Sequence, residues 1–245
     1  MSDFGTWFKS VPFMTRHWLA LTVGFTLLGK LGVLRFDQMI LLYEPFLHRF
    51  QIWRPLTALF YYPLVPSTGF HFLINCYFLY NYSLRLETGV FSGRKADYFF
   101  LLFFNWLTCV VLGLVMSFTL LMDPMVLSVL YIWCNLNKDT IVSFWFGSRF
   151  KAMYLPWVLL AFNAIVAGGG VMELMGIIVG HLYFFLMYTY PQELGGPRLI
   201  STPQLFYDWF PNENEAATGF GQPPAAGEQP RRRHQWGTGH VLGGN

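Results

Sequence analysis

The sequence contains few charged residues. Asp, Glu, Lys and Arg together make up 12% of the chain, whereas hydrophobic residues make up 54% and aromatic residues 20%. An ordinary soluble domain carries about 25% charged residues, so this chain lacks the charge that would let it cover itself in water. The composition therefore indicates an integral membrane protein.

Patterns typical of other protein classes are also missing. Outside the tail, no block of Lys and Arg is interleaved with aromatic residues, and the net charge is only +3, so nucleic-acid binding is not predicted. Cys76, Cys109 and Cys134 lie in apolar segments at unrelated spacings, which argues against a disulfide framework and against a metal site. The chain has no P-loop pattern, and no cofactor is predicted.

Long charge-free intervals locate the predicted membrane spans. A helix needs roughly 20 residues to cross ~30 Å of hydrocarbon. The first span is interrupted by Lys30, whose ammonium can reach the interface along its apolar stem, and the fourth is short and contains Asn135 and Asn137. The predicted spans are 17–34, 55–84, 98–122, 124–137, 152–172 and 174–192. The predicted fold is therefore all-α and polytopic, with six transmembrane helices in a domain of residues 1–192.

The positions of Lys and Arg predict the orientation. With six spans, the loops 85–95 and 138–151 lie on the same side as both termini, and they carry six Lys and Arg residues. Both termini are therefore predicted to be cytosolic. Asn81 begins the only glycosylation sequon and falls on this side, so it is predicted to carry no sugar. Residues 1–16 are interpreted as an uncleaved amphipathic lead-in and not as a signal peptide, because no small-residue cleavage site follows.

Trp53 and Arg54 stand together at the beginning of the second span. Pro55 suits the first turn of a helix, the Trp ring suits a membrane interface, and Arg can reach lipid phosphates or loop carbonyls. Two interpretations of Arg54 stay open at this point. It is either an interfacial anchor or a specific contact that defines the fold.

Three stretches carry a resemblance to a known family. RFQIWRPLTALFYYP, GFHFLINCYFLYNYSLRLETGVFSGRKADYFFLLFFNW and IVSFWFGSRFKAMYLPWVLLAFN are similar to the derlins, and the resemblance extends from residue 1 to about 210. Derlins belong to the rhomboid superfamily, in which a Trp-Arg pair of the first loop matches Trp53 and Arg54. The resemblance implies a rhomboid-like fold in the endoplasmic-reticulum membrane and a role in withdrawing misfolded client proteins to the cytosol for degradation. It also implies an ER ubiquitin ligase complex as a partner, and homo- or hetero-oligomers with other derlins.

The sequence lacks the catalytic pair of an active rhomboid protease. Such an enzyme places a Ser in a Gly-x-Ser-Gly pattern and a His in a His-x-x-Gly-x-x-x-Gly pattern. Ser128 has neither flanking glycine, and Glu173 stands where the His would be, three residues before Gly176. His181 lies about 12 Å along the helix and roughly 80° around it from Glu173, so it cannot replace the missing base. No catalytic residue is predicted, and Ser128 is interpreted as a packing residue bonded to its own preceding turn.

Gly176 and Gly180 form a small-xxx-small face on the sixth predicted span. This pattern predicts a close approach of another helix, which the resemblance identifies as the fourth, while oligomerisation is the alternative. Polar residues within the spans are expensive unless they face one another, water or a guest polypeptide. They are Asn75, Asn105, Asn135, Asn137, Asn163 and Glu173. Together with the short fourth helix they suggest local thinning and wetting of the membrane.

Residues 193–245 are predicted to be a cytosolic tail that is mostly disordered beyond Pro211, because Gly, Pro, Ala and polar residues cannot bury a core. The segment 236–243 has the pattern Trp-Gly-x-Gly-x-x-Leu-Gly, which resembles the box by which derlins bind the hexameric ATPase valosin-containing protein. Val241 departs from that box at a position that is often basic. The matching residues are Trp236, Gly237, Gly239, Leu242 and Gly243.

Three functions can be ranked from these observations. The favoured prediction is a non-catalytic membrane protein that assists retrotranslocation by locally thinning or opening the lipid and by recruiting the ATPase. The second is an oligomeric protein-conducting channel. The third is an active intramembrane serine protease.

Overall fold

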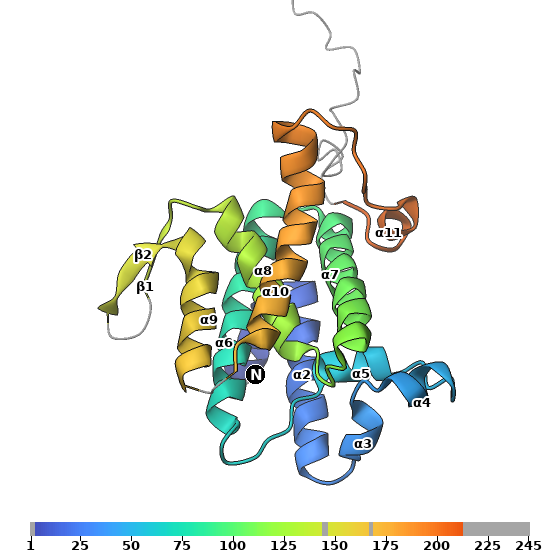
Figure 1. Ribbon diagram of the computed structural model, residues 1–245. Helices are drawn as coiled ribbons and strands as arrows, with labels where there is room; N and C mark the ends of the chain where they lie inside the picture. Colours follow the sequence, from blue (N-terminus) through green and yellow to red (C-terminus); the bar gives the residue numbers. More distant parts are fainter. Residues whose placement is uncertain (1–2, 144–146, 167–168, 213–245) are drawn as a thin grey trace, which may run out of the picture.

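The computed structural model describes residues 3–143, 147–166 and 169–212, which are mostly helical (Figure 1). In chain order the elements are α1 (Asp3–Ser10), α2 (Phe13–Lys30), α3 (Phe36–Met39), α4 (Tyr43–Leu47), α5 (Arg54–Phe60), α6 (Gly69–Arg85), the π-helical turn η1 (Leu86–Val90), α7 (Lys95–Met116), α8 (Met122–Leu136), β1 (Ile141–Ser143), β2 (Arg149–Lys151), the 3-10 turn η3 (Ala152–Tyr154), α9 (Leu155–Val166), α10 (Val171–Phe184), the π-helical η4 (Phe185–Glu193) and α11 (Gln204–Trp209).

Each predicted span overlaps one of the main helices α2, α6, α7, α8, α9 and α10. Within the described residues, two helices are both long and apolar enough to cross a membrane, Lys95–Met116 and the continuous helix Val171–Glu193. The apolar helices α8 and α9 are shorter, as expected for the fourth span, and the number of spans stays a prediction.

The predicted span 55–84 is wrong as a single helix. The chain instead forms α5, continues without helical structure from Tyr61 to Pro66, and begins α6 at Gly69. Pro63 and Pro66 lie in this break, and proline both lacks an N–H donor and disfavours helical geometry in the residue before it. The break leaves α6 with 17 residues.

Helix α8 lies at the centre of the bundle, where α6, α7, α9 and α10 all pack against it (Figure 1). All its residues from Pro124 to Cys134 are buried. A helix that is apolar around its whole circumference suits either a protein core or a lipid-facing span. Packing against α6, α7, α9 and α10, and not apolarity alone, distinguishes α8.

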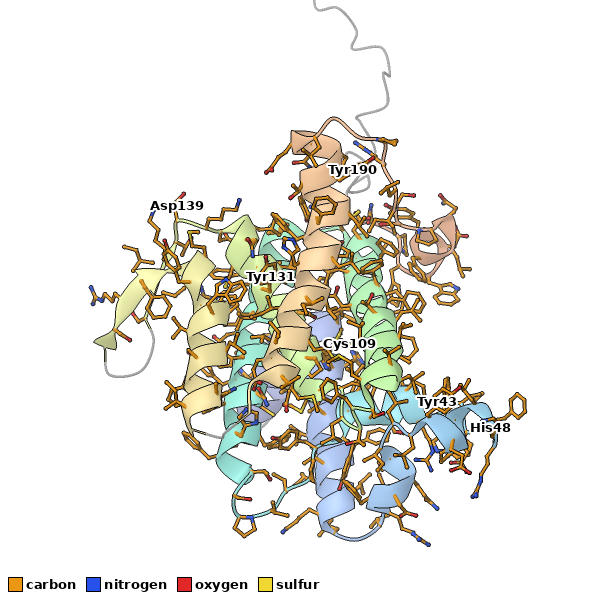
Figure 2. The ribbon with its side chains drawn as sticks, in the orientation of Figure 1. Tyr43, His48, Cys109, Tyr131, Asp139 and Tyr190 are labelled. Atoms are coloured by element: carbon orange, nitrogen blue, oxygen red, sulfur yellow. The ribbon has the colours of Figure 1, made fainter. Side chains whose placement is uncertain are left out.

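The two ends of the bundle differ. Helices α3, α4 and α5 gather at one end, and α4 carries Tyr43 and His48 outward on a projecting arm (Figure 2). We call this the α5 end. At the other end, β1 and β2 form an antiparallel hairpin in which Val142 pairs with Phe150. We call this the hairpin end.

The last described helix, α11, packs against α7. Phe206 is buried, and its ring lies 5.0 Å from that of Phe99 at an interplanar angle of 90°. Asp97 Oδ1 accepts hydrogen bonds from Thr202 Oγ1 at 2.6 Å and from Tyr207 OH at 2.7 Å. Burial raises the pKa of Tyr207 to about 12, so its hydroxyl stays protonated and can donate at neutral pH. The first part of the predicted tail, 193–245, is thereby fixed to α7.

Candidate functional site

A cavity of about 440 Å³ lies between α6, α8, α9 and α10. Its volume falls within the range of ligand-binding pockets, roughly 300–1,000 Å³. Most of its wall is apolar, but one end is polar. The lining residues are His71, Leu73, Ile74, Asn75, Tyr77, Phe78, Tyr82, Asp123, Val126, Leu127, Leu130, Ser143, Leu155, Leu159, Phe162, Asn163 and Glu173.

Five of these residues form what we call the polar cluster: His71, Asn75, Asp123, Asn163 and Glu173. Asn75 Nδ2 donates to Asp123 Oδ1 at 2.5 Å, and Asn163 Nδ2 donates to Glu173 Oε1 at 2.6 Å. Asp123 and Glu173 lie in the first turns of α8 and α10, where the positive end of the helix dipole stabilises a carboxylate. The starts of three helices thus meet at the polar end of the cavity, toward the α5 end of the bundle.

His71 connects the two amide–carboxylate pairs. Its Nδ1 shares a hydrogen bond of 2.7 Å with the hydroxyl of Tyr62 and lies 3.3 Å from Asn75 Nδ2. Its Nε2 lies 3.4 Å from Asn163 Nδ2 and 4.0 Å from Glu173 Oε1. The imidazole therefore stands between the pair on α6 and α8 and the pair on α9 and α10.

The cavity extends away from the polar cluster toward the hairpin end. On α6 its lining runs from His71 to Tyr82, about 16 Å at a helical rise of 1.5 Å per residue. Ser143 of β1 also lines it. The hollow therefore extends over roughly half of the ~30 Å thickness of a hydrocarbon core.

The predicted polar residues of the spans divide into two groups. Asn75, Asn163 and Glu173 join the polar cluster. The other three do not: Asn105 donates to Ser128 Oγ at 3.1 Å, and Asn135 and Asn137 donate to carbonyls one turn earlier in α8, at 3.0 and 2.9 Å. Sequence reasoning missed three members of the site, His71, Asp123 and the adjacent Tyr62. In the sequence Asp123 is the single residue between the predicted spans 98–122 and 124–137, and a carboxylate at the start of a predicted membrane helix is a signal that could have found the site.

Ser128 is fully buried in α8 and makes two hydrogen bonds. Its Oγ donates to the carbonyl of Met125 at 2.8 Å, and it accepts from Asn105 Nδ2 at 3.1 Å. The hydroxyl is therefore held by its own helix and by α7. Among the described residues, no histidine is hydrogen-bonded to it.

His181 and Ser128 lie at a similar level along the bundle. Gly180, the residue before His181, packs against Ser128, because a Cβ added to Gly180 would stand 2.7 Å from the Ser128 carbonyl oxygen. The side chain of His181 nevertheless points elsewhere. His181 is exposed, and its Nδ1 shares a hydrogen bond of 2.8 Å with the hydroxyl of Tyr131, which lies on the central helix behind α10 (Figure 2). What keeps His181 from acting as a base for Ser128 is thus the direction of the two side chains more than the distance along the helix.

Gly176 and Gly180 face α8 at very short range. A Cβ on Gly176 would lie 2.7 Å from the carbonyl oxygen of Pro124, and one on Gly180 would lie 3.0 Å from the Tyr131 Cβ. Both distances are shorter than ordinary Cβ contacts. The two helices can therefore approach this closely only because residues 176 and 180 have no side chain. This interface is within one chain.

Arg54 fastens the segment that precedes α5. Arg54 is 5% exposed, and its guanidinium donates to the carbonyls of Asp37 at 2.7 Å and Ile40 at 2.8 Å and, through Nε, to Gln51 Oε1 at 2.6 Å. Burial lowers the pKa of Arg54, but a guanidinium remains charged at neutral pH. Trp53, in contrast, is 48% exposed. Of the two open interpretations, a contact within the fold describes Arg54, and an interfacial position is compatible with Trp53.

The predicted tail, 193–245, is described only as far as residue 212. The rest of the predicted disordered segment lies outside the described residues, and so does the box with Trp236, Gly237, Gly239, Leu242 and Gly243. They remain predictions from the sequence.

Comparison with known proteins agrees with the resemblance in the sequence. Derlin-1 of Homo sapiens is 55% identical over 249 residues, which cover 99% of this chain and 99% of the relative. Derlin-1 of Caenorhabditis elegans is 50% identical over 246 residues, and that of Drosophila melanogaster 43% over 245, each covering 99% of this chain and 100% of the relative. The pattern of the Der1-like family matches residues 11–204. The chain therefore belongs to the Der1-like family of membrane proteins, which includes the derlins.

Proposed function

We propose that this protein is a non-catalytic, rhomboid-like factor of the endoplasmic-reticulum membrane that helps misfolded proteins return to the cytosol for degradation. The observation that carries the proposal is the cavity between α6, α8, α9 and α10, a membrane-embedded hollow with a polar end. In this proposal the α5 end faces the lumen, and the hairpin end faces the cytosol together with both termini.

The surroundings of Ser128 support a non-catalytic role. Serine hydrolysis needs a base within hydrogen-bond reach of the hydroxyl, about 2.6–3.2 Å. The Ser128 hydroxyl instead donates to a backbone carbonyl, and the amide of Asn105 donates to it. A nucleophile held in this way has no described group that could take its proton.

The cavity supports a role in moving polypeptides. A polypeptide backbone crossing lipid loses its hydrogen bonds to water, and each unsatisfied group costs several kcal/mol. A hollow that offers carboxylates, amides and an imidazole can replace part of that hydration. The cavity covers the part of the bilayer nearer the lumen and leads toward the cytosolic hairpin, which is the direction that a client must travel.

The short helices support local thinning of the membrane. Helix α8 has 15 residues and α9 has 12, which at 1.5 Å per residue give lengths of about 22 and 18 Å. Both are shorter than the ~30 Å of a typical hydrocarbon core. Lipid around such helices thins to match them, which shortens the path that a client must cross.

Filling the cavity tests the proposal. Leu159 is 5% exposed and lines the cavity from α9, whereas Leu107 is 46% exposed on α7. We expect L159W to slow the extraction of a misfolded client from ER membranes about tenfold, and L107W to leave the rate unchanged, because only the first side chain enters the hollow. The measurement is the rate at which a pulse-labelled client reaches the cytosolic fraction.

Equal rates for L159W and the unmodified protein, with both folded, would contradict a role of the cavity. Peptide-bond cleavage by the purified protein that disappears in S128A would contradict the non-catalytic assignment and favour the protease instead.

A further inference from the structure

The polar cluster has more positions that can accept a hydrogen bond than groups that can donate one. An ionised carboxylate only accepts, and it offers about four lone-pair positions. Asp123 and Glu173 each accept one amide N–H, from Asn75 and Asn163 respectively. His71 adds a 4.0 Å approach to Glu173. The cluster therefore has acceptor capacity left when its carboxylates are charged.

The charge of the cluster is also unbalanced. It contains two carboxylates and one imidazole, so when Asp123 and Glu173 are both ionised one imidazole cannot balance their charge. No lysine or arginine lines the cavity within the described part of the chain. Charges that are removed from water normally pair with a partner of opposite charge. The missing partner of this cluster is a cation.

The wall next to the cluster is apolar. Leu159 lies one helical turn before Asn163 on α9, and Leu127 lies one turn after Asp123 on α8. Phe162 lies on the same wall. A ligand that suits both parts has a cationic head with several N–H donors and an aliphatic stem. Lysine and arginine side chains have this form, with three and five donors respectively and no acceptor.

We propose that the polar cluster binds a lysine or arginine side chain carried by an otherwise apolar segment of a client protein. This inference rests on the proposed function and names the class of client that the cavity selects. A basic residue in an orphaned or misassembled membrane segment has no counter-ion in lipid. The cavity supplies two carboxylates for the head and an apolar wall for the stem. A glutamate at the same position of the client would be repelled by the two carboxylates, and a leucine would offer no donor to them.

Site-specific crosslinking tests the selection. A photoreactive amino acid replaces Phe162 in the full-length chain, which is placed in phosphatidylcholine nanodiscs with a single-span client. The client carries Arg, Lys, Gln, Leu or Glu at its centre. We expect Arg and Lys clients to crosslink about tenfold more than the Gln, Leu and Glu clients, the ratio that corresponds to 1.4 kcal/mol.

Three variants assign the preference to the cluster. D123N/E173Q keeps the shape of both side chains and removes their charge, so the Arg and Lys clients should fall to the level of the Gln client. L159K places a lysine one turn from Asn163, where it can occupy the cluster itself, and should abolish the preference while both carboxylates stay. D139N removes an exposed carboxylate that is bonded to Lys151 at the hairpin end, and should leave the preference unchanged.

The outcomes separate this inference from the function on which it rests. Equal crosslinking of all clients to the unmodified protein would overturn the selection of a cation and leave a client-binding cavity intact. A preference that survives in L159K or in D123N/E173Q would also overturn it, and would make the two carboxylates stabilisers of their own helix starts. Crosslinking of no client at all would contradict the proposed function. Loss of the preference when phosphatidylethanolamine is added would identify a lipid ammonium as the occupant and overturn the client assignment.

Discussion

At the scale of single residues, Arg54 shows how one buried side chain can organise a long loop. It donates to the carbonyls of Asp37 and Ile40, which precede α4 in the chain, and so ties that part of the loop to the first turn of α5. Removing the guanidinium would leave buried carbonyls without donors. We expect R54A to lower the free energy of unfolding by about 2 kcal/mol, the range for hydrogen bonds to a charged group.

Denaturant titration in detergent measures this change, with R35A as the matched control. Arg35 forms an exposed ion pair with Asp37, and exposed pairs contribute about 0–1 kcal/mol. If R54A and R35A had equal effects, Arg54 would not be fastening the loop.

The sequence predicted the importance of Arg54 but not its partners. The chemistry of arginine alone does not distinguish an anchor at the membrane surface from a contact within the fold, because both use the same guanidinium donors. The choice depends on where the carbonyls of residues 37 and 40 point, and that is set by the conformation of a loop with little periodic pattern. For the same reason the sequence does not predict the hydrogen bond between His71 and Tyr62, which are nine residues apart and separated by an irregular segment.

At the scale of helices, the α8–α10 interface depends on two glycines. A Cβ at Gly176 would approach the Pro124 carbonyl oxygen to 2.7 Å, and backbone cannot move aside as a flexible side chain can. We therefore expect G176A to lower the free energy of unfolding by about 1–3 kcal/mol through overpacking. G24A on α2 is the control, because a Cβ there meets nothing within 4 Å.

The control should change stability in the opposite direction. Alanine is favoured over glycine inside a helix by roughly 0.5–1 kcal/mol, so G24A should be neutral or slightly stabilising. Comparing the unfolding of G176A and G24A with that of the unmodified protein tests both expectations. A destabilised G24A together with an unchanged G176A would show that the glycine spacing is not what brings α8 and α10 together.

Helix pairing was easier to predict than helix ends. The spacing of Gly176 and Gly180 is a local signal that survives in the structure as a contact. The span 55–84, however, was predicted from the absence of charge alone. That criterion takes no account of Pro63 and Pro66, so it did not predict the break between α5 and α6. Charge marks where a segment can leave the membrane, whereas proline marks where a helix must stop. For the end of a helix, the positions of proline are therefore a better guide than the positions of charge.

At the scale of the whole molecule, α11 links the tail to the membrane domain. Phe206 is buried against α7, and Thr202 and Tyr207 donate to Asp97, so the first part of the predicted tail is held against the membrane domain. A pulling ATPase that is bound to the tail would thus be tethered through α11 to the membrane domain. The proposed division of labour follows: the bundle eases passage through lipid, and the tail brings the source of force.

The tail provides the last prediction. In the box 236–243 the aromatic and aliphatic anchors are Trp236 and Leu242, and such anchors dominate the binding energy of short peptide ligands. We expect W236A/L242A to reduce recovery of the valosin-containing ATPase in pull-downs about tenfold or more. V241R, which restores the basic residue typical of the box, should increase recovery. Because α11 is held by Asp97 well before the box, both variants should leave the membrane domain as stable as in the unmodified protein. Undiminished recovery with W236A/L242A would show that the ATPase, if it binds, is held by another part of the chain, and would remove the tail from the mechanism.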